Sequence, residues 1–159
     1  MLIAVLTVSD RCSRGEANDT AGPAVVDRLR EQWPAAVIDA ALAPDDEDRI
    51  SKYLEEKCAG NASLILTVGG TGLSPRDRTP EATLRVVDRL VPGLPEAMRS
   101  KGSESSRYAW LSRAVAGLRG GSLIVNLPGS QRGALESLDS ILPLLRHALE
   151  VASGSHSHT

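Results

Sequence analysis

The sequence contains very few of the residues on which several large classes of enzyme depend. Only three of its 159 residues are histidines, and two of them, His156 and His158, lie in the C-terminal segment SGSHSHT. The third, His147, falls on a predicted apolar helix, where a packed or surface histidine is the simpler interpretation. A histidine-based catalytic triad or a histidine-rich zinc site therefore has almost no material. We expect residues 153–159 to form a disordered tail.

Cysteine and aromatic residues are also scarce. Cys12 and Cys58 form neither a CxxC motif nor a disulfide framework, which favours free thiols in a reducing cytoplasm. Phenylalanine is absent and aromatic residues make up only 3% of the chain, so Leu, Val, Ile and Ala have to fill the core. The remaining composition, 42% hydrophobic and 24% charged, is typical of one globular domain, which we place at residues 1–152.

Long apolar runs and concentrated positive charge are missing as well. The run LIAVLTV near the N-terminus is too short to span a bilayer, and no basic residues precede it as they would in a signal peptide. The net charge is −2, and no block of Lys or Arg is present. The sequence therefore predicts binding neither to nucleic acid nor to a membrane.

What is present is a regular alternation of predicted strands and helices. Buried strands are predicted at 2–8, 35–43 and 63–68, each followed by a helix signal, at Pro23, at the acidic run 45–48 and at Thr79-Pro80-Glu81. The third of these helices carries Leu84, Val87 and Leu90 and is expected to end at Pro92-Gly93. A short helix at 94–101, two strands around Gly120-Gly121 and a Leu-rich helix at 131–151 with Pro143 inside complete the chain. This order predicts a three-layer α/β/α sandwich with a mostly parallel sheet.

Four polar loops follow predicted strands, at the end where open α/β sheets bind ligands. They are SDRCSRGE after the first strand, PDDED after the second, GGTGLSPRD after the third and NLPGSQRG after the last. All four are rich in Gly, Pro, Ser, Asp or Arg. We expect them to form one binding site.

The loop GGTGLSPRD carries the most specific chemistry. Its glycines can adopt positive φ and let ligand oxygens approach backbone N–H groups without a Cβ in the way. Arg76 and Arg78 suit phosphate, whereas Asp77 between them suits a Mg²⁺ ion held beside phosphate. The alternative is that Asp77 only pairs with the flanking arginines. The P-loop ending GK[ST] and the pattern GxGxxG are both absent.

Taken in order, the segments TVSD, PDDEDRI, LTVGGTGLSPRDRTPEAT and LSRAVAGLRGGSLIVNLPGS and the Leu-rich last helix resemble the molybdopterin adenylyltransferase family. That family includes stand-alone bacterial enzymes of molybdenum-cofactor synthesis and the corresponding domain of gephyrin-like fused proteins. The resemblance covers residues 2–151 and implies a molybdopterin-binding fold with a mixed sheet, usually assembled as a homotrimer. It also implies a cytoplasmic reaction in which molybdopterin and ATP, with Mg²⁺, give adenylyl-molybdopterin and pyrophosphate.

The resemblance further implies roles for individual residues. The two functionally important aspartates fall on Asp45 and Asp77, as catalytic residues and Mg²⁺ ligands. Asp46 could cap the following helix or take the role given to Asp45, and Asp45 itself could be only a helix-cap acid. For Ser112 the alternative to ligand contact is a hydroxyl bonded to its own backbone, and for Asn126 an amide that satisfies a strand end. The implied substrate-binding residues are Ser9, Asp10, Gly69, Gly70, Thr71, Gly72, Ser112, Asn126, Pro128 and Gly129.

Other functions stay open at this point. A protein of the same fold can bind molybdopterin without catalysis, hydrolyse a phosphate ester or pyrophosphate, or act only through trimerisation. The presence of both Asp45 and Asp77 favours the enzyme. The expected partners are molybdopterin, ATP and further copies of the chain; contacts with other cofactor-synthesis proteins are left open.

Overall fold

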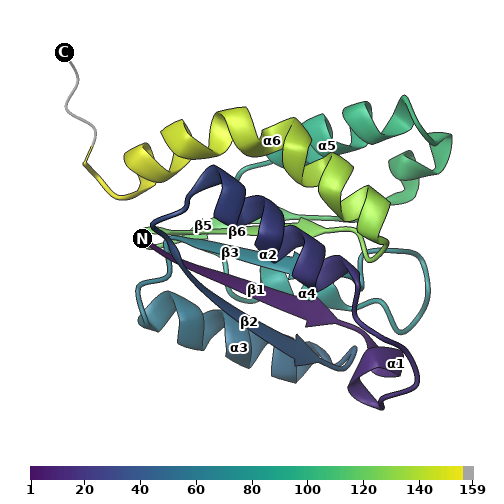
Figure 1. The fold of residues 1–159 in the computed structure, drawn as a ribbon. Coiled ribbons are helices and arrows are strands. Elements are labelled where there is room, and N and C mark those ends of the chain that lie inside the picture. Colours follow the sequence, from purple (N-terminus) through teal and green to yellow (C-terminus); the bar gives the residue numbers. More distant parts are fainter. Residues whose placement is uncertain (156–159) are drawn as a thin grey trace.

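The computed structural model describes residues 1–155, so His156 and His158 of the predicted tail lie outside the described residues. Six strands form one sheet in the order β2-β1-β3-β6-β5-β4 (Figure 1). The four parallel strands are β1 (Leu2–Val8), β2 (Val37–Ala43), β3 (Leu64–Val68) and β6 (Ser122–Leu127). The other two, β5 (Ala116–Arg119) and β4 (Arg89–Leu90), run antiparallel to their neighbours. The predicted mostly parallel, mixed sheet is therefore confirmed.

Helices cover both faces of this sheet, as the predicted three-layer sandwich requires (Figure 1). One face packs against α2 (Ala21–Gln32), α5 (Gly93–Ser103) and α6 (Gln131–Ala152), and the other against α3 (Glu47–Ala59) and α4 (Thr79–Leu84). Alternate residues of a strand point to opposite faces of the sheet. Ile3 therefore packs in the core beneath α2, α5 and α6, and Ala4 packs in the core beneath α3 and α4. Each large aliphatic side chain buried in this way contributes roughly 1.5–3 kcal/mol.

The helix predicted from Thr79 to Pro92 is shorter than its apolar spacing indicated. It ends at Leu84, and Arg89–Leu90 forms the edge strand β4 beside β5. The backbone explains the difference, since the N–H groups of Asp88 and Val91 donate to carbonyls of β5 at 2.7 and 2.8 Å. Tertiary pairing has overridden helical spacing here, and the predicted helix beyond Leu84 was wrong.

Two short elements lie in segments for which the sequence predicted neither a helix nor a strand. The first loop contains α1 (Asp10–Ser13), and the segment before the fifth strand contains the 3-10 helix η1 (Arg107–Leu111). The last helix runs without interruption through the exposed Pro143. No helix in the described part of the chain is long and apolar enough to cross a membrane.

Candidate functional site

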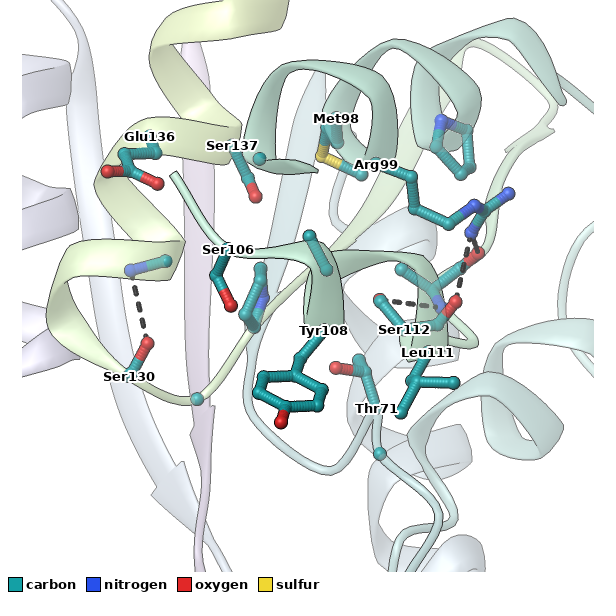
Figure 2. A pocket seen from close by; sticks show the side chains of 18 of the residues that line it. Thr71, Met98, Arg99, Ser106, Tyr108, Leu111, Ser112, Ser130, Glu136 and Ser137 are labelled. Atoms are coloured by element: carbon teal, nitrogen blue, oxygen red, sulfur yellow. Dashed lines mark hydrogen bonds between the residues drawn. The ribbon is translucent and has the colours of Figure 1, made fainter. Parts of the chain in front are cut away.

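Two cavities adjoin at the carboxyl ends of the parallel strands, where the four polar loops meet. The larger, of about 640 Å³, lies between residues 70–77, α5, η1 and the start of α6 (Figure 2). The smaller, of about 300 Å³, lies between the loops that follow β1, β2 and β3. Gly70, Asp77 and Gly129 line both cavities. The predicted convergence of the four loops is thus present in the fold.

The segment of residues 69–77, called here the glycine loop, separates the two cavities. Its first two glycines have positive φ, 109° at Gly69 and 68° at Gly70. A Cβ on Gly69 would lie 2.4 Å from the Val8 carbonyl oxygen, and one on Gly70 would lie 2.2 Å from Thr79 Oγ1. Both positions therefore require glycine for conformation and for space.

The glycine loop leaves backbone donors free for a ligand. The Gly69 N–H donates to the Leu127 carbonyl at 3.0 Å, which ties the loop to the end of β6. No hydrogen bond within the described residues uses the N–H groups of Gly70, Thr71 or Gly72. Successive free N–H groups without bulky side chains are the usual arrangement for binding phosphate oxygens.

Asp10 and Asp45 hold each other at the edge of the smaller cavity. The Asp10 N–H donates to Asp45 Oδ2 and the Asp45 N–H donates to Asp10 Oδ1, both at 3.0 Å. Asp10 is placed by α1, whose first turn is capped by Ser9 Oγ accepting from the Cys12 N–H at 3.2 Å. The cap of α3 is Asp46, which accepts from the Arg49 N–H. Asp45 is thereby free of the capping role that the sequence left open.

The two arginines that flank Asp77 in sequence pair with other carboxylates. Arg76 donates two hydrogen bonds to Asp10, at 2.9 and 3.0 Å, and Arg78 donates two to Glu47, at 3.0 and 2.8 Å. The Asp77 carboxylate instead accepts the Ser74 N–H at 3.0 Å. The alternative in which Asp77 merely neutralises its neighbouring arginines is therefore not what the structure contains.

Negative charge accumulates where the two cavities meet. Burial raises the pKa of Asp45, and the carboxylates of Asp10 and Asp77 raise it further, against the hydrogen bond from the Asp10 N–H and the charge of Arg76. Partial desolvation raises the pKa of Asp10, but the hydrogen bond from the Asp45 N–H and the pairing with Arg76 outweigh it and lower the pKa overall. Asp45 and Asp77 thus lie close to Asp10, which already binds Arg76, and an added cation would stabilise their negative charges.

The acidic residues do not form a complete metal site by themselves. In the described part of the chain, no three His, Cys, Asp or Glu side chains are grouped so as to hold a metal ion. Mg²⁺ commonly uses only one or two protein carboxylates, with substrate phosphates and water supplying the other oxygens. Asp45 and Asp77 fit that pattern, since both carboxylates lie beside the glycine loop.

The two polar residues expected to contact ligand lie in different environments. Ser112 lines the larger cavity, and its Oγ accepts from the Ala114 N–H at 3.3 Å (Figure 2). Asn126 is fully buried; its Nδ2 donates to Thr67 Oγ1 and Thr83 Oγ1, both at 2.9 Å, and its Oδ1 accepts from the Val115 N–H. Asn126 therefore connects β3, α4 and Val115, in agreement with the alternative that its amide satisfies a strand end, and it lines neither cavity.

The remaining expected residues are distributed over both cavities. Thr71, Gly72 and Pro128 line the larger one, whereas Ser9, Asp10 and Gly69 line the smaller one. All of them come from loops that follow parallel strands. The structure thus brings every expected substrate-binding residue except Asn126 to a cavity wall.

The apolar wall of the larger cavity was not predicted from the sequence. Met98 of α5 and Tyr108 and Leu111 of η1 line it together with residues of the glycine loop (Figure 2). Arg99 supports this wall by donating to the carbonyls of Ser112 and Ala114 at 3.2 and 3.3 Å. The sequence did contain one signal for this wall, because two of the four aromatic residues of the chain, Tyr108 and Trp110, lie in an otherwise polar segment.

The fold and site together define an α/β protein with two adjoining cavities at the carboxyl edge of its sheet. A family model described as a probable molybdopterin binding domain matches residues 4–147, and the chain belongs to this family. The resemblance read from the motifs is confirmed.

Similar proteins agree with this assignment. A protein named molybdopterin adenylyltransferase from Helicobacter pylori is 36% identical over 156 residues, which cover 97% of this chain and 89% of that protein. A molybdenum cofactor biosynthesis bifunctional protein from Synechococcus elongatus is 38% identical over 155 residues, which cover 98% of this chain and 48% of that protein. The crystal structure of the molybdopterin biosynthesis enzyme MoaB from Thermus thermophilus superposes with a TM-score of 0.87, at 48% identity and 96% coverage of each chain. Several of the relatives are longer, and the chain spans half their length or less.

Proposed function

We propose that this protein transfers the adenylyl group of ATP to the terminal phosphate of molybdopterin, releasing pyrophosphate, in molybdenum-cofactor biosynthesis. The observation that carries the proposal is the pair of cavities that share Gly70, Asp77 and Gly129. A reaction between two bound substrates needs two sites that meet at the reacting atoms. The carboxylates of Asp45 and Asp77 and the free N–H groups of the glycine loop lie at that junction.

The character of each cavity suggests which substrate it holds. The larger cavity combines an apolar wall at Met98, Tyr108 and Leu111 with the hydroxyl of Ser112, which suits a flat heterocycle with polar edges. The N-terminus of the long helix α6 borders this cavity and favours the pterin phosphate. The smaller cavity, with Ser9 and Asp10, then receives the nucleotide.

Catalysis in this arrangement consists of positioning and charge neutralisation, since both substrates are anionic and no protein nucleophile is needed. The glycine loop orients phosphate oxygens through its free N–H groups. Asp45 and Asp77 would hold Mg²⁺ together with phosphate oxygens; when bound, the ion supplies neutralisation of phosphate charge. Asp10 fixes Asp45 through their reciprocal hydrogen bonds.

The direct test is to incubate the purified protein with molybdopterin, ATP and Mg²⁺ and to measure adenylyl-molybdopterin and pyrophosphate. Omission of Mg²⁺, or addition of EDTA, is expected to abolish product formation. Binding of molybdopterin without any product under these conditions would favour the second candidate, a non-catalytic molybdopterin-binding protein. The match to a family described by molybdopterin binding, and not by a reaction, is the observation that favours this second candidate.

We further propose that the protein acts as a cytoplasmic homotrimer. Large apolar side chains such as Val37, Leu84 and Leu90 are at least half exposed in the single chain. This exposure leaves apolar surface for subunit contacts. Both cysteines are free thiols, as expected in a reducing compartment. Light scattering at micromolar concentration should give three times the mass of one chain, and a monomer would contradict the trimer.

A further inference from the structure

Arg113 binds the glycine loop and the helix after it at four points. Its N–H donates to the Thr71 carbonyl at 2.9 Å, its Nε to the Gly72 carbonyl and its Nη2 to the Asp77 carbonyl, both at 2.8 Å. Its Nη1 pairs with Glu81 Oε1 in the first turn of α4. One residue outside the loop thus holds both ends of the segment that separates the two cavities.

These contacts act on the groups that the proposed reaction uses. Asp77 is fixed twice by Ser74, through its own N–H and through its carboxylate, and its carbonyl is fixed by Arg113. The contacts to Thr71 and Gly72 hold the stretch that carries the free N–H groups. The guanidinium is bound to protein acceptors and does not line either cavity, so it acts through the loop and not on a substrate.

The ion pair with Glu81 strengthens this arrangement. Partial burial raises the pKa of Glu81, but the hydrogen bond and charge of Arg113 outweigh it and lower the pKa overall. The side chains of Arg113 and Glu81 are 34% and 27% exposed, so the pair is sheltered from solvent. Charge-assisted hydrogen bonds of this kind are stronger than neutral ones and hold a fixed geometry.

We infer that Arg113 is a positioning residue that holds Asp77 and the free N–H groups of the glycine loop in the geometry needed for adenylyl transfer. The inference rests on the proposed function. Arg113 follows Ser112 directly, so it also joins the wall of the larger cavity to the loop shared by both cavities. The forked guanidinium is essential to this role, because the single nitrogen of lysine cannot reach both loop carbonyls and Glu81 at once.

The test compares Arg113→Lys with Arg119→Lys. Arg119 is a matched control, since its Nη1 also donates to a backbone carbonyl, that of Val86, at 2.9 Å. It lies by the cavity at the opposite end of the sheet, beside Gly120 and Gly121. We expect kcat of Arg113→Lys to fall about tenfold or more, while the dissociation constant for molybdopterin changes by less than about threefold. Arg119→Lys should keep the wild-type kcat.

Hydrogen exchange of the ligand-free proteins gives a second readout that does not depend on activity. The hydrogen-bonded backbone amides of Ser74, Asp77 and Thr79 should exchange faster in Arg113→Lys, and not in Arg119→Lys, with unchanged exchange in the central strands. An active wild type with unchanged kcat and unchanged loop exchange in Arg113→Lys would overturn the inference. An inactive wild type would refute the proposed function. In that case, faster loop exchange in Arg113→Lys would still support the positioning of the loop by Arg113, and unchanged exchange would overturn it.

Should Arg113→Lys fail to fold, Glu81→Gln replaces it. This variant keeps the shape of the side chain and the hydrogen bonds from Arg113 to the loop carbonyls, but removes the charge that fixes the guanidinium. A decreased kcat with faster exchange at the amides of Ser74, Asp77 and Thr79 would support the inference. Wild-type values of both quantities would overturn it.

Discussion

The chain contains two pairs of adjacent glycines, and they lie at opposite ends of the sheet. Gly69 and Gly70 follow β3 at the carboxyl edge, whereas Gly120 and Gly121 form the turn between β5 and β6. Positive φ occurs in both pairs, at 109° and 68° in the first and at 55° in Gly120. The two pairs are identical in sequence, but they have different roles in the structure.

The space around the two pairs differs more than their backbone conformation. A Cβ on Gly70 would lie 2.2 Å from Thr79 Oγ1 and 3.1 Å from Asp45 Oδ1, whereas one on Gly120 would meet nothing within 4 Å. Gly120 is needed to turn a hairpin, and Gly70 is needed to bring backbone, hydroxyl and carboxylate together. Close packing behind the glycines, more than their number, distinguishes a binding loop from a turn.

The largest effect should come from the aspartate beside the first pair. Asp77→Asn keeps size and shape but removes the charge that a hard cation requires. We expect adenylyl transfer to fall about 100-fold or more, equivalent to roughly 3 kcal/mol, while molybdopterin still binds. Asp88→Asn is the matched control, because Asp88 Oδ2 accepts the Gly120 N–H beside the second pair. Near-normal Mg²⁺-dependent turnover of Asp77→Asn would contradict the role assigned to Asp77.

Alanine at Gly70 and at Gly120 tests the comparison directly. Both substitutions cost about 1–2 kcal/mol, because each places a Cβ on a left-handed backbone. Gly70→Ala should cost about 1–3 kcal/mol more, since Thr79 has to move to admit the new atom. Urea unfolding of the two variants measures the difference. Equal losses of stability would show that the space behind Gly70 can be relieved without cost.

One serine near each end of the sheet, Ser112 and Ser122, gives a smaller contrast between ligand binding and stability. Ser112→Ala should weaken molybdopterin binding by about tenfold or less and leave the thermal midpoint nearly unchanged, as for a partly exposed hydroxyl. Ser122 is buried and donates to the Ala62 carbonyl at 2.6 Å, so Ser122→Ala should lower the midpoint and leave binding intact. The opposite pattern would mean that Ser112 is structural.

The sequence predicted the parts of the molecule that depend on local chemistry. The strands β1 and β3 were predicted from apolar runs, and the start of α3 was predicted from its acidic run. The choice between Asp45 and Asp46 was not, because it depends on Asp10, which is 35 residues from Asp45 along the chain. The burial of Asn126 and the bracing by Arg113 likewise depend on contacts between distant segments, which no local pattern contains. The edge strand β4 was missed for the same reason.

The smallest expected effect comes from Gly120→Asn. Asparagine tolerates a left-handed backbone better than other residues with a Cβ, and the position has open space within 4 Å of the new atom. We expect a loss of stability below about 1 kcal/mol, or a thermal midpoint lower by at most roughly 4 °C, with unchanged turnover. Gly70→Asn meets the same backbone demand but cannot accommodate its side chain beside Thr79 and Asp45, so it should lose turnover as well as stability. If both variants behaved alike in stability and turnover, the backbone conformation alone would account for the two glycine pairs, and the packing behind Gly70 would have no part in the site.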